Sequence, residues 1–341
     1  MEILERILVI QTAFLGDAVL TLPMIQKLKE QFPASNIYVL CIPSTEELFS
    51  KSAQVKAAIV FDKNGRQKSI LKLFSLIKSL RGLKLTRVYS PHRSFRSTLI
   101  AYLCGANYKT GFDAGACSFL YSTQIKYCSN IHEVARNLKL IGIDTQKENW
   151  KILPQLRIFQ NDESKVETLL NEINLKKIAA VAPGSVWRTK KYPEEYFVQL
   201  IHSLLNDNYF VFLIGGMEDK NLCENILANF FQNVRSIAGD FSVTESVALL
   251  KHCNILISND SAPTHLGMIA NIPTLTIYCS TVPQFGFYPY NEKSDFISFD
   301  DLKCKPCGIH GLNACPIKTF DCGFKLLPEF VIKKIREIAS E

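Results

Sequence analysis

Apolar and polar positions change period along the first half of the chain, which predicts strands that alternate with helices. Apolar runs typical of buried strands lie at residues 6–11, 36–41, 55–61 and 86–90. Segments with apolar residues at helical spacing lie between them, at residues 17–33, 45–52 and 67–81. This alternation predicts a parallel, doubly wound sheet.

The same alternation returns in the second half. Strands are predicted at residues 178–182, 209–214, 234–238, 255–257 and 273–278, with helices from Pro193, over 243–252 and over 328–340. We expect the stretch 255–280 to close this second sheet.

The segment 144–161 is polar, contains Pro154 and interrupts the apolar periodicity, as a connector between domains does. A chain of 341 residues is also long for one core. We therefore predict an α/β protein with two Rossmann-like doubly wound domains, 1–155 and 156–341, and a cleft between their facing carboxyl edges.

Composition is that of a globular protein, with 47% hydrophobic and 21% charged residues. The apolar runs are too short to span a bilayer and the N-terminus lacks a signal-peptide pattern, so we expect a cytoplasmic protein. The net charge of +7 is dispersed, which argues against nucleic acid and favours an anionic small molecule or an anionic membrane face. No strongly basic amphipathic helix stands out, so membrane contact would be peripheral.

The stretch 255–281 contains a candidate phosphate site. Ser258–Ser261 is a cluster of capping residues between a strand and a helix, and Pro263 suits the first helical turn. The N–H groups and dipole of such a helix start attract phosphate. An ordinary capped helix explains the pattern equally well.

Two further loops of the second domain reach the same sheet edge. Lys190 could place its ammonium on a diphosphate, and Glu218 could accept hydrogen bonds from sugar hydroxyls. Singly, Lys190 could be a surface lysine, Glu218 a turn residue and Asp260 a cap. Their coincidence at one edge favours a nucleotide-diphosphate pocket.

In the first domain, Asp17 is predicted at a helix N-terminus after the first strand, where an N-cap is the simpler role. The preceding loop is not G-x-G-x-x-G, which disfavours a dehydrogenase. Arg93 and Arg96 are predicted at the start of a later helix, where they could clamp an anionic substrate or form a solvated basic turn. His132 and Arg136 share an i, i+4 helix face that could line the cleft or lie on the surface.

Four cysteines near the C-terminus form the pattern C-x2-C-x7-C-x6-C. These are Cys304, Cys307, Cys315 and Cys322. Reduced thiols, a structural zinc site and two disulfides are all compatible with the pattern, and a cytoplasmic location argues against the disulfides.

Five segments resemble those of the ADP-heptose:lipopolysaccharide heptosyltransferases, glycosyltransferase family 9. They are LVIQTAFLGDAVLTLP, PGSVWRTKKYPEEYF, GGMED, SNDSAPTHLGMIANIPTLTIYCST and CKPCGIHGLNACP, in the order of the family. The resemblance implies a GT-B architecture in which the first domain mainly holds the acceptor, the second domain mainly holds ADP-heptose and the last helix packs back toward the first domain. It also implies an inverting transfer of heptose from ADP-heptose to the lipid A-core acceptor, without a required cofactor. The candidate acceptor-binding residues are then Arg93, Arg96, His132 and Arg136. The resemblance leaves open whether the first or the second heptose is added.

The resemblance also implies roles for individual residues. Asp17 matches the catalytic base, Lys190 the phosphate-binding lysine and Glu218 the ribose-side glutamate. The donor motif D-[ST]-G-x-x-H is matched by Asp260, Ser261, Ala262 and His265. Ala262 replaces the glycine of many members, and its methyl group puts close backbone contact with the donor in doubt.

Two alternatives remain at this level. One is a related GT-B glycosyltransferase that uses another nucleotide-sugar in cell-surface glycan synthesis, since donor choice depends on pocket shape. The other is a non-catalytic module that binds nucleotide or metal.

Overall fold

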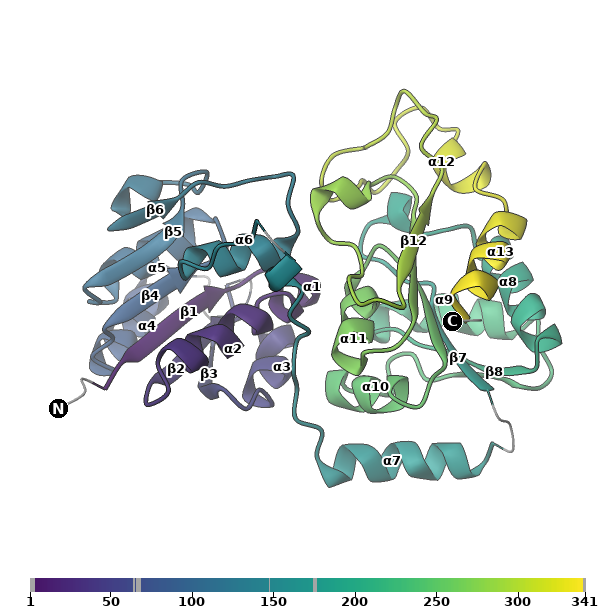
Figure 1. The fold of residues 1–341 in the computed structure, drawn as a ribbon, viewed down its shortest axis with the longest axis horizontal. Helices are drawn as coiled ribbons and strands as arrows, with labels where there is room; N and C mark the ends of the chain where they lie inside the picture. Colours follow the sequence, from purple (N-terminus) through teal and green to yellow (C-terminus); the bar gives the residue numbers. More distant parts are fainter. Residues whose placement is uncertain (1–3, 64, 66–68, 147, 174–176, 340–341) are drawn as a thin grey trace. The chain divides into compact units, whose positions relative to one another are not determined.

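The computed structural model describes residues 4–63, 65, 69–146, 148–173 and 177–339. Residues 67, 68 and 340, which two of the predicted helices include, lie outside this described part. The chain folds into two compact units, Met1–Arg157 and Ile158–Glu341. Figure 1 shows each unit as an α/β body.

The first unit contains a six-stranded sheet in which every described pairing is parallel. Its order is β3-β2-β1-β4-β5-β6. The strands are β1 (Arg6–Gln11), β2 (Asn36–Cys41), β3 (Val55–Val60), β4 (Arg87–Ser90), β5 (Tyr108–Phe112) and β6 (Thr123–Ile125). The helices are α1 (Leu15–Val19), α2 (Leu22–Gln31), α3 (Glu46–Ser50), α4 (Ile70–Gly82), α5 (Phe95–Leu103) and α6 (Glu133–Leu140), with short 3-10 turns η1 (Pro43–Thr45), η2 (Ser118–Leu120) and η3 (Glu148–Trp150).

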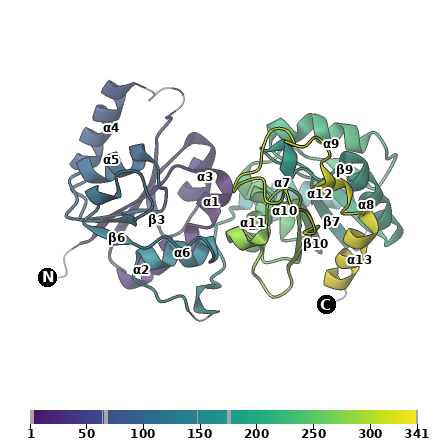
Figure 2. The same ribbon diagram turned by 90° about the horizontal axis from the view of Figure 1, so that it is seen from above.

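Helices cover both faces of this sheet. Helices α2 and α6 contact each other on one face, and α4 and α5 lie on the other (Figure 2). On the α4 and α5 face, Leu76 and Leu80 of α4 and Ile100 of α5 pack on Leu8 and Ile10 of β1. Burial on both faces explains why β1 is an almost uninterrupted apolar run.

The second unit repeats the same topology. Its sheet order is β12-β11-β10-β7-β8-β9, again with parallel pairing. The strands are β7 (Lys177–Ala182), β8 (Tyr209–Leu213), β9 (Val234–Ser236), β10 (Ile255–Asn259), β11 (Thr274–Tyr278) and β12 (Asp295–Ser298). The helices are α7 (Gln160–Asn171), α8 (Glu194–Asn206), α9 (Lys220–Leu227), α10 (Val243–Leu250), α11 (Ala262–Ala270), α12 (Asp321–Phe324) and α13 (Pro328–Ala339), with 3-10 turns η4 (Arg188–Lys190), η5 (Met217–Asp219) and η6 (Pro283–Phe285).

Three strands are absent from the sequence-based prediction. They are the edge strands β6 and β12 and the inner strand β5, all of which are short and contain polar residues that weaken the apolar signal. As a result, the stretch 255–280 does not close the second sheet as predicted, because β12 pairs with β11 beyond it.

Two helices also differ from expectation. The predicted helix 17–33 is divided into α1 and α2 around Leu20 and Thr21. The C-terminal helix α13 packs against α8, β11 and β12 of its own unit, and its packing on the first unit stays a prediction. None of the helices in the described ranges has the length and apolar character needed to cross a bilayer.

Candidate functional site

In the second unit the strand order reverses between β7 and β10, and the loops after these two strands meet there. Lys190 lies in the turn η4 after β7, and Asp260 directly follows β10. Ligands of open α/β sheets bind at such a switch point, beyond the carboxyl ends of the strands. The two residues therefore lie where the fold favours a ligand.

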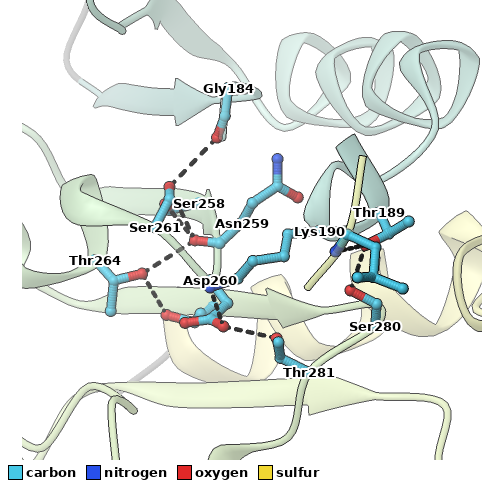
Figure 3. Close-up of polar contacts among 12 residues, drawn as sticks. Gly184, Thr189, Lys190, Ser258, Asn259, Asp260, Ser261, Thr264, Ser280 and Thr281 are labelled. Carbon is cyan, nitrogen blue, oxygen red and sulfur yellow. Dashed lines mark hydrogen bonds and ion pairs between the residues drawn. The ribbon is translucent and has the colours of Figure 1, made fainter. Parts of the chain in front are cut away.

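The Lys190 ammonium and the Asp260 carboxylate form an ion pair, with 2.6 Å between Nζ and Oδ2. The Thr281 hydroxyl donates a hydrogen bond to the same carboxylate oxygen at 2.6 Å. Figure 3 shows the Lys190 side chain extending toward Asp260. Because only 14% and 10% of the two side chains are exposed, water screens the pair weakly. Lys190 is thus a fixed charge at the switch point and not a solvated surface lysine.

Asp260 is not the cap of helix α11. The N-cap is Ser261, which has an extended backbone and makes no side-chain capping bond. The Ser261 hydroxyl instead donates to the Gly184 carbonyl at 3.3 Å, as Figure 3 shows. Ser258 and Asn259, predicted as capping residues, are the last residues of β10. The first turn of α11, beginning at Ala262, therefore presents its positive dipole end without a capping side chain. Pro263 has no N–H, and the Thr264 N–H donates to the Ser261 carbonyl at 3.2 Å, so the dipole and the Ala262 N–H are what this turn can offer an anion.

Asn259 fixes this arrangement from inside the sheet. Its Nδ2 donates to the Pro183 carbonyl at 2.7 Å, and its Oδ1 accepts from the Tyr192 N–H at 3.0 Å. These bonds join the end of β10 to both sides of the loop that carries Lys190. The ion pair is therefore positioned by backbone contacts.

His265 lies on α11, and its side chain is buried. Burial is the main cause that lowers its pKa to about 4, while the Asp260 carboxylate raises the pKa and the Lys190 ammonium lowers it. Its Nδ1 has no hydrogen-bond partner among the described residues. At physiological pH the His265 imidazole beside the ion pair is therefore neutral.

A loop near the C-terminus, residues 304–315, packs on the turn that carries Lys190. Leu312 exchanges two hydrogen bonds with Thr189, one to its N–H at 3.0 Å and one to its hydroxyl at 2.8 Å. The Thr189 hydroxyl also lies 2.9 Å from that of Ser280 (Figure 3). Gly311, at φ +79°, lies so close that an added Cβ would be 2.9 Å from Lys190 Cγ. In the sequence, only the glycines of the segment CKPCGIHGLNACP indicate this close packing.

The loop after β8 carries the predicted Glu218 and an adjacent carboxylate that sequence analysis missed. Glu218 is exposed in η5. Asp219 is the packed residue, since its Oδ2 accepts from the Gly216 N–H at 3.1 Å and its carboxylate fills the space beside Gly184. Burial raises the pKa of Asp219, against the lowering effects of the Gly216 N–H and Lys191. The signal was the absence of a side chain at Gly184 and Gly215, where a Cβ would overlap Asp219.

In the first unit, Asp17 lies at the equivalent switch point, between β1 and β4. It occupies the first turn of α1, whose N-cap is Phe14, so Asp17 is not the cap. The Asp17 backbone carbonyl accepts from the Thr21 hydroxyl at 2.8 Å, and this bond fixes the short helix. Its carboxylate is close enough to Tyr127 to raise the pKa of that phenol, together with burial as the larger cause.

Tyr127 also links Asp17 to the basic residues after β4. The Arg93 guanidinium lies 3.9 Å from the centre of the Tyr127 ring. The neighbouring His92 contacts the hydroxyls of Thr12 at 2.8 Å and Ser97 at 3.0 Å through Nδ1. Burial, with the charges of Lys63 and Arg93, lowers its pKa to about 4. Arg93 and Asp17 thus belong to one polar cluster.

The other predicted acceptor residues differ in their surroundings. Arg96 is exposed and donates to the Lys63 carbonyl at 3.2 Å. Arg136 is 1% exposed, pairs with Glu133 at 2.6 Å and donates to backbone carbonyls of the preceding loop. His132 does not share a helix face with Arg136, because it is the buried N-cap of α6 and its Nδ1 accepts from the Val134 N–H. Contacts of this kind stabilise the fold. Contact of His132 and Arg136 with the acceptor stays a prediction, and the burial of both side chains argues against it.

The four C-terminal cysteines line one pocket of about 180 Å³. All four are free thiols and are not joined as two disulfides. Within the described ranges, no three His, Cys, Asp or Glu side chains come together as a metal site would require. The geometry therefore gives the zinc alternative no support.

Two doubly wound units, each with a strand-order reversal at its centre, form the GT-B fold, which the solved structures described below share. The model of glycosyltransferase family 9 (heptosyltransferase) matches residues 73–311, and the chain belongs to this family.

Curated relatives cover most of the chain. Lipopolysaccharide heptosyltransferase 2 of Escherichia coli is 24% identical over an alignment of 302 residues, and the match covers 82% of this chain and 84% of that protein. Lipooligosaccharide heptosyltransferase 2 of Campylobacter jejuni is 24% identical over an alignment of 332 residues, and the match covers 96% of this chain and 97% of that protein. The solved E. coli ADP-heptose lps heptosyltransferase II matches with a TM-score of 0.79 and 22% identity, covering 98% of each chain, and this likeness shows the fold.

Proposed function

We propose that this glycosyltransferase transfers heptose from ADP-heptose to the lipid A-core acceptor of lipopolysaccharide. The observation that carries the proposal is the Lys190 ammonium, fixed at the switch point beside the uncapped start of α11. A diphosphate is the ligand that suits an ammonium and a helix N-terminus together. The relatives named as heptosyltransferases support heptose as the transferred sugar.

The second unit would bind the donor and stabilise its leaving group. Departure of ADP from the anomeric carbon builds negative charge on the β-phosphate, and Lys190 with the positive dipole end of α11 would stabilise this charge. Asp260 and His265 would keep Lys190 in place from the other side. Glu218 would contact the ribose, while Ser261 and Ala262 would lie along the diphosphate.

The first unit would hold the acceptor. As the acceptor hydroxyl attacks the anomeric carbon from the face opposite ADP, its proton would pass to the Asp17 carboxylate. An aspartate is a weak base for a sugar hydroxyl, so positioning matters more than basicity. Arg93 and Arg96 would bind anionic groups of the acceptor.

The same proposal implies peripheral contact with the inner membrane from the cytoplasmic side, because the acceptor is anchored there by lipid A. The first and the second heptose addition differ in the acceptor, which carries no heptose in the first case and one heptose in the second. An assay with both acceptors therefore distinguishes them.

The test is a donor panel with turnover as the readout. ADP-heptose, ADP-glucose and UDP-glucose are each incubated with lipid A-core acceptors that carry no heptose or one heptose, and acceptor mass is measured. We expect transfer from ADP-heptose to one acceptor of the two. Faster transfer from another nucleotide-sugar would support the related GT-B transferase instead, and no turnover with any donor would refute the proposal.

A further inference from the structure

Four large apolar side chains of the first unit are exposed to solvent on the same side of its sheet. Leu71 and Phe74 of α4 are 78% and 57% exposed, Phe95 at the start of α5 is 53% exposed, and Phe119 of η2 is 74% exposed. Monomeric proteins rarely leave large apolar side chains grouped in this way without a partner. We call these four residues the apolar rim.

The segments that carry the apolar rim contact one another. Helices α4 and α5 share one core, lie side by side in Figures 1 and 2, and are joined where Arg81 donates to the Leu103 carbonyl at 2.7 Å. The Ala116 N–H donates to the Arg93 carbonyl at 3.2 Å, and η2 contacts α5. Phe119 therefore belongs beside the first turn of α5.

The fold also sets the direction of these helices. Helices α4 and α5 each follow a strand of a parallel sheet, so both begin at its carboxyl edge. Leu71 and Phe95 lie in the first turns of their helices, and Phe74 begins the second turn of α4. The apolar rim therefore borders the edge that carries Asp17 and Arg93.

Charge indicates what the rim contacts. Helix α4 carries Lys72, Lys78 and Arg81 and no acidic residue, and α5 carries Arg96 and no acidic residue. Lys72, Lys78 and Arg96 are exposed. Apolar side chains that insert between lipids, flanked by cations that contact lipid phosphates, are typical of peripheral membrane surfaces.

We propose that the apolar rim and the flanking cations dock the first unit on an anionic bilayer. The inference rests on the proposed function in one respect, since a lipid-anchored acceptor gives the docking its purpose. Docking by these residues would present the acceptor-side edge to the membrane surface, where the sugar of a lipid-linked acceptor emerges.

The first experiment measures sedimentation of the full chain with vesicles, without any sugar substrate. Vesicles contain either neutral lipid alone or 30% phosphatidylglycerol. A triple variant, Leu71→Ser, Phe74→Ser and Phe119→Ser, removes the apolar side chains, and Phe231→Ser is the matched control, because Phe231 is an exposed phenylalanine of the second unit.

We expect the wild type and Phe231→Ser to bind anionic vesicles equally and neutral vesicles more weakly. Since membrane affinity scales with inserted apolar area, the triple variant should bind anionic vesicles more weakly by more than about tenfold. Equal binding of the triple variant and the wild type, or no binding of the wild type, would overturn the proposal. So would an equal loss in Phe231→Ser.

A second measurement separates docking from misfolding and from failure of the proposed function. ADP affinity and melting temperature of the triple variant should equal those of the wild type, since the changed side chains are exposed. Transfer to a deacylated acceptor should also be unchanged, and transfer to a vesicle-embedded acceptor should fall. Loss of vesicle binding together with a lowered melting temperature would count against the rim, whereas intact vesicle binding without heptose transfer would count against the proposed function alone.

Discussion

Two glycines of the C-terminal loop provide a matched pair for testing how Lys190 is positioned. Gly308 and Gly311 have almost the same backbone angle, with φ at +80° and +79°. An alanine at either position would destabilise the folded state by about 1–2 kcal/mol, because its side chain disfavours the left-handed region. The two differ in their surroundings, because an added Cβ meets nothing within 4 Å at Gly308 and lies 2.9 Å from Lys190 Cγ at Gly311.

The difference predicts separate effects on stability and on ADP binding. Gly308→Ala should lower the free energy of unfolding by about 1–2 kcal/mol because of its strained φ, and Gly311→Ala should lower it by at least as much, because its Cβ also meets close neighbours. Only Gly311→Ala should displace Lys190 and the hydroxyl pair of Thr189 and Ser280 beside it. Full loss of the Lys190 contact with a diphosphate would weaken ADP binding about 5–150-fold. A partial displacement should therefore weaken it by about 5–20-fold.

The assay is titration calorimetry with ADP, combined with urea unfolding of both variants. Equal ADP affinity of Gly311→Ala and Gly308→Ala would refute the idea that this loop positions Lys190. An equal loss of affinity in both variants would refute it as well, because the loss would then follow from loop strain alone.

Two further predictions concern charge. Lys190→Ala should weaken ADP binding by about 1–3 kcal/mol, the range for a charge-assisted contact. Lys177→Ala, at the opposite end of β7, should leave the ADP affinity measured by calorimetry unchanged. Equal ADP affinities in the two variants would contradict the role assigned to Lys190. The pKa of buried His265 lies near 4 in the folded chain and near 6.5 in the unfolded chain, so below pH 6.5 the unfolded chain binds more protons. Stability should therefore fall as pH drops from 6.5 toward 4, and urea unfolding of His265→Gln should show a shallower pH dependence than the wild type.

The alternation of strands and helices was predictable because the central strands are buried on both faces. Strands such as β10 and β11 are buried along their whole length, so their apolar runs are unmistakable. The edge strands β6 and β12 escaped prediction because partial burial leaves polar residues in them. The same limit explains the division of helix 17–33, where Thr21 bonds to the Asp17 carbonyl, a contact that no apolar periodicity encodes.

The sequence was enough to predict which residues of the site lie at one sheet edge. It was not enough to predict which of these residues contact one another. Lys190 and Asp260 are 70 positions apart by their numbers, and only the strand order brings β7 beside β10 and lets them pair. The sequence likewise could not distinguish the packed Asp219 from the exposed Glu218. Leu71 and Phe74 were hidden for a related reason, since in a helical pattern they resemble core positions until Leu76, Ile77 and Leu80 are seen to form the buried face.

The most direct test of the proposed reaction compares Asp17→Asn with the wild type in two measurements on the same protein. The change is nearly isosteric and removes only the basic carboxylate, so ADP affinity by calorimetry should be unchanged. Heptose transfer, followed as the mass gain of the acceptor, should fall by about 10²–10⁴-fold. Transfer at close to the wild-type rate would remove Asp17 from the chemistry and contradict the account of how the acceptor hydroxyl is activated.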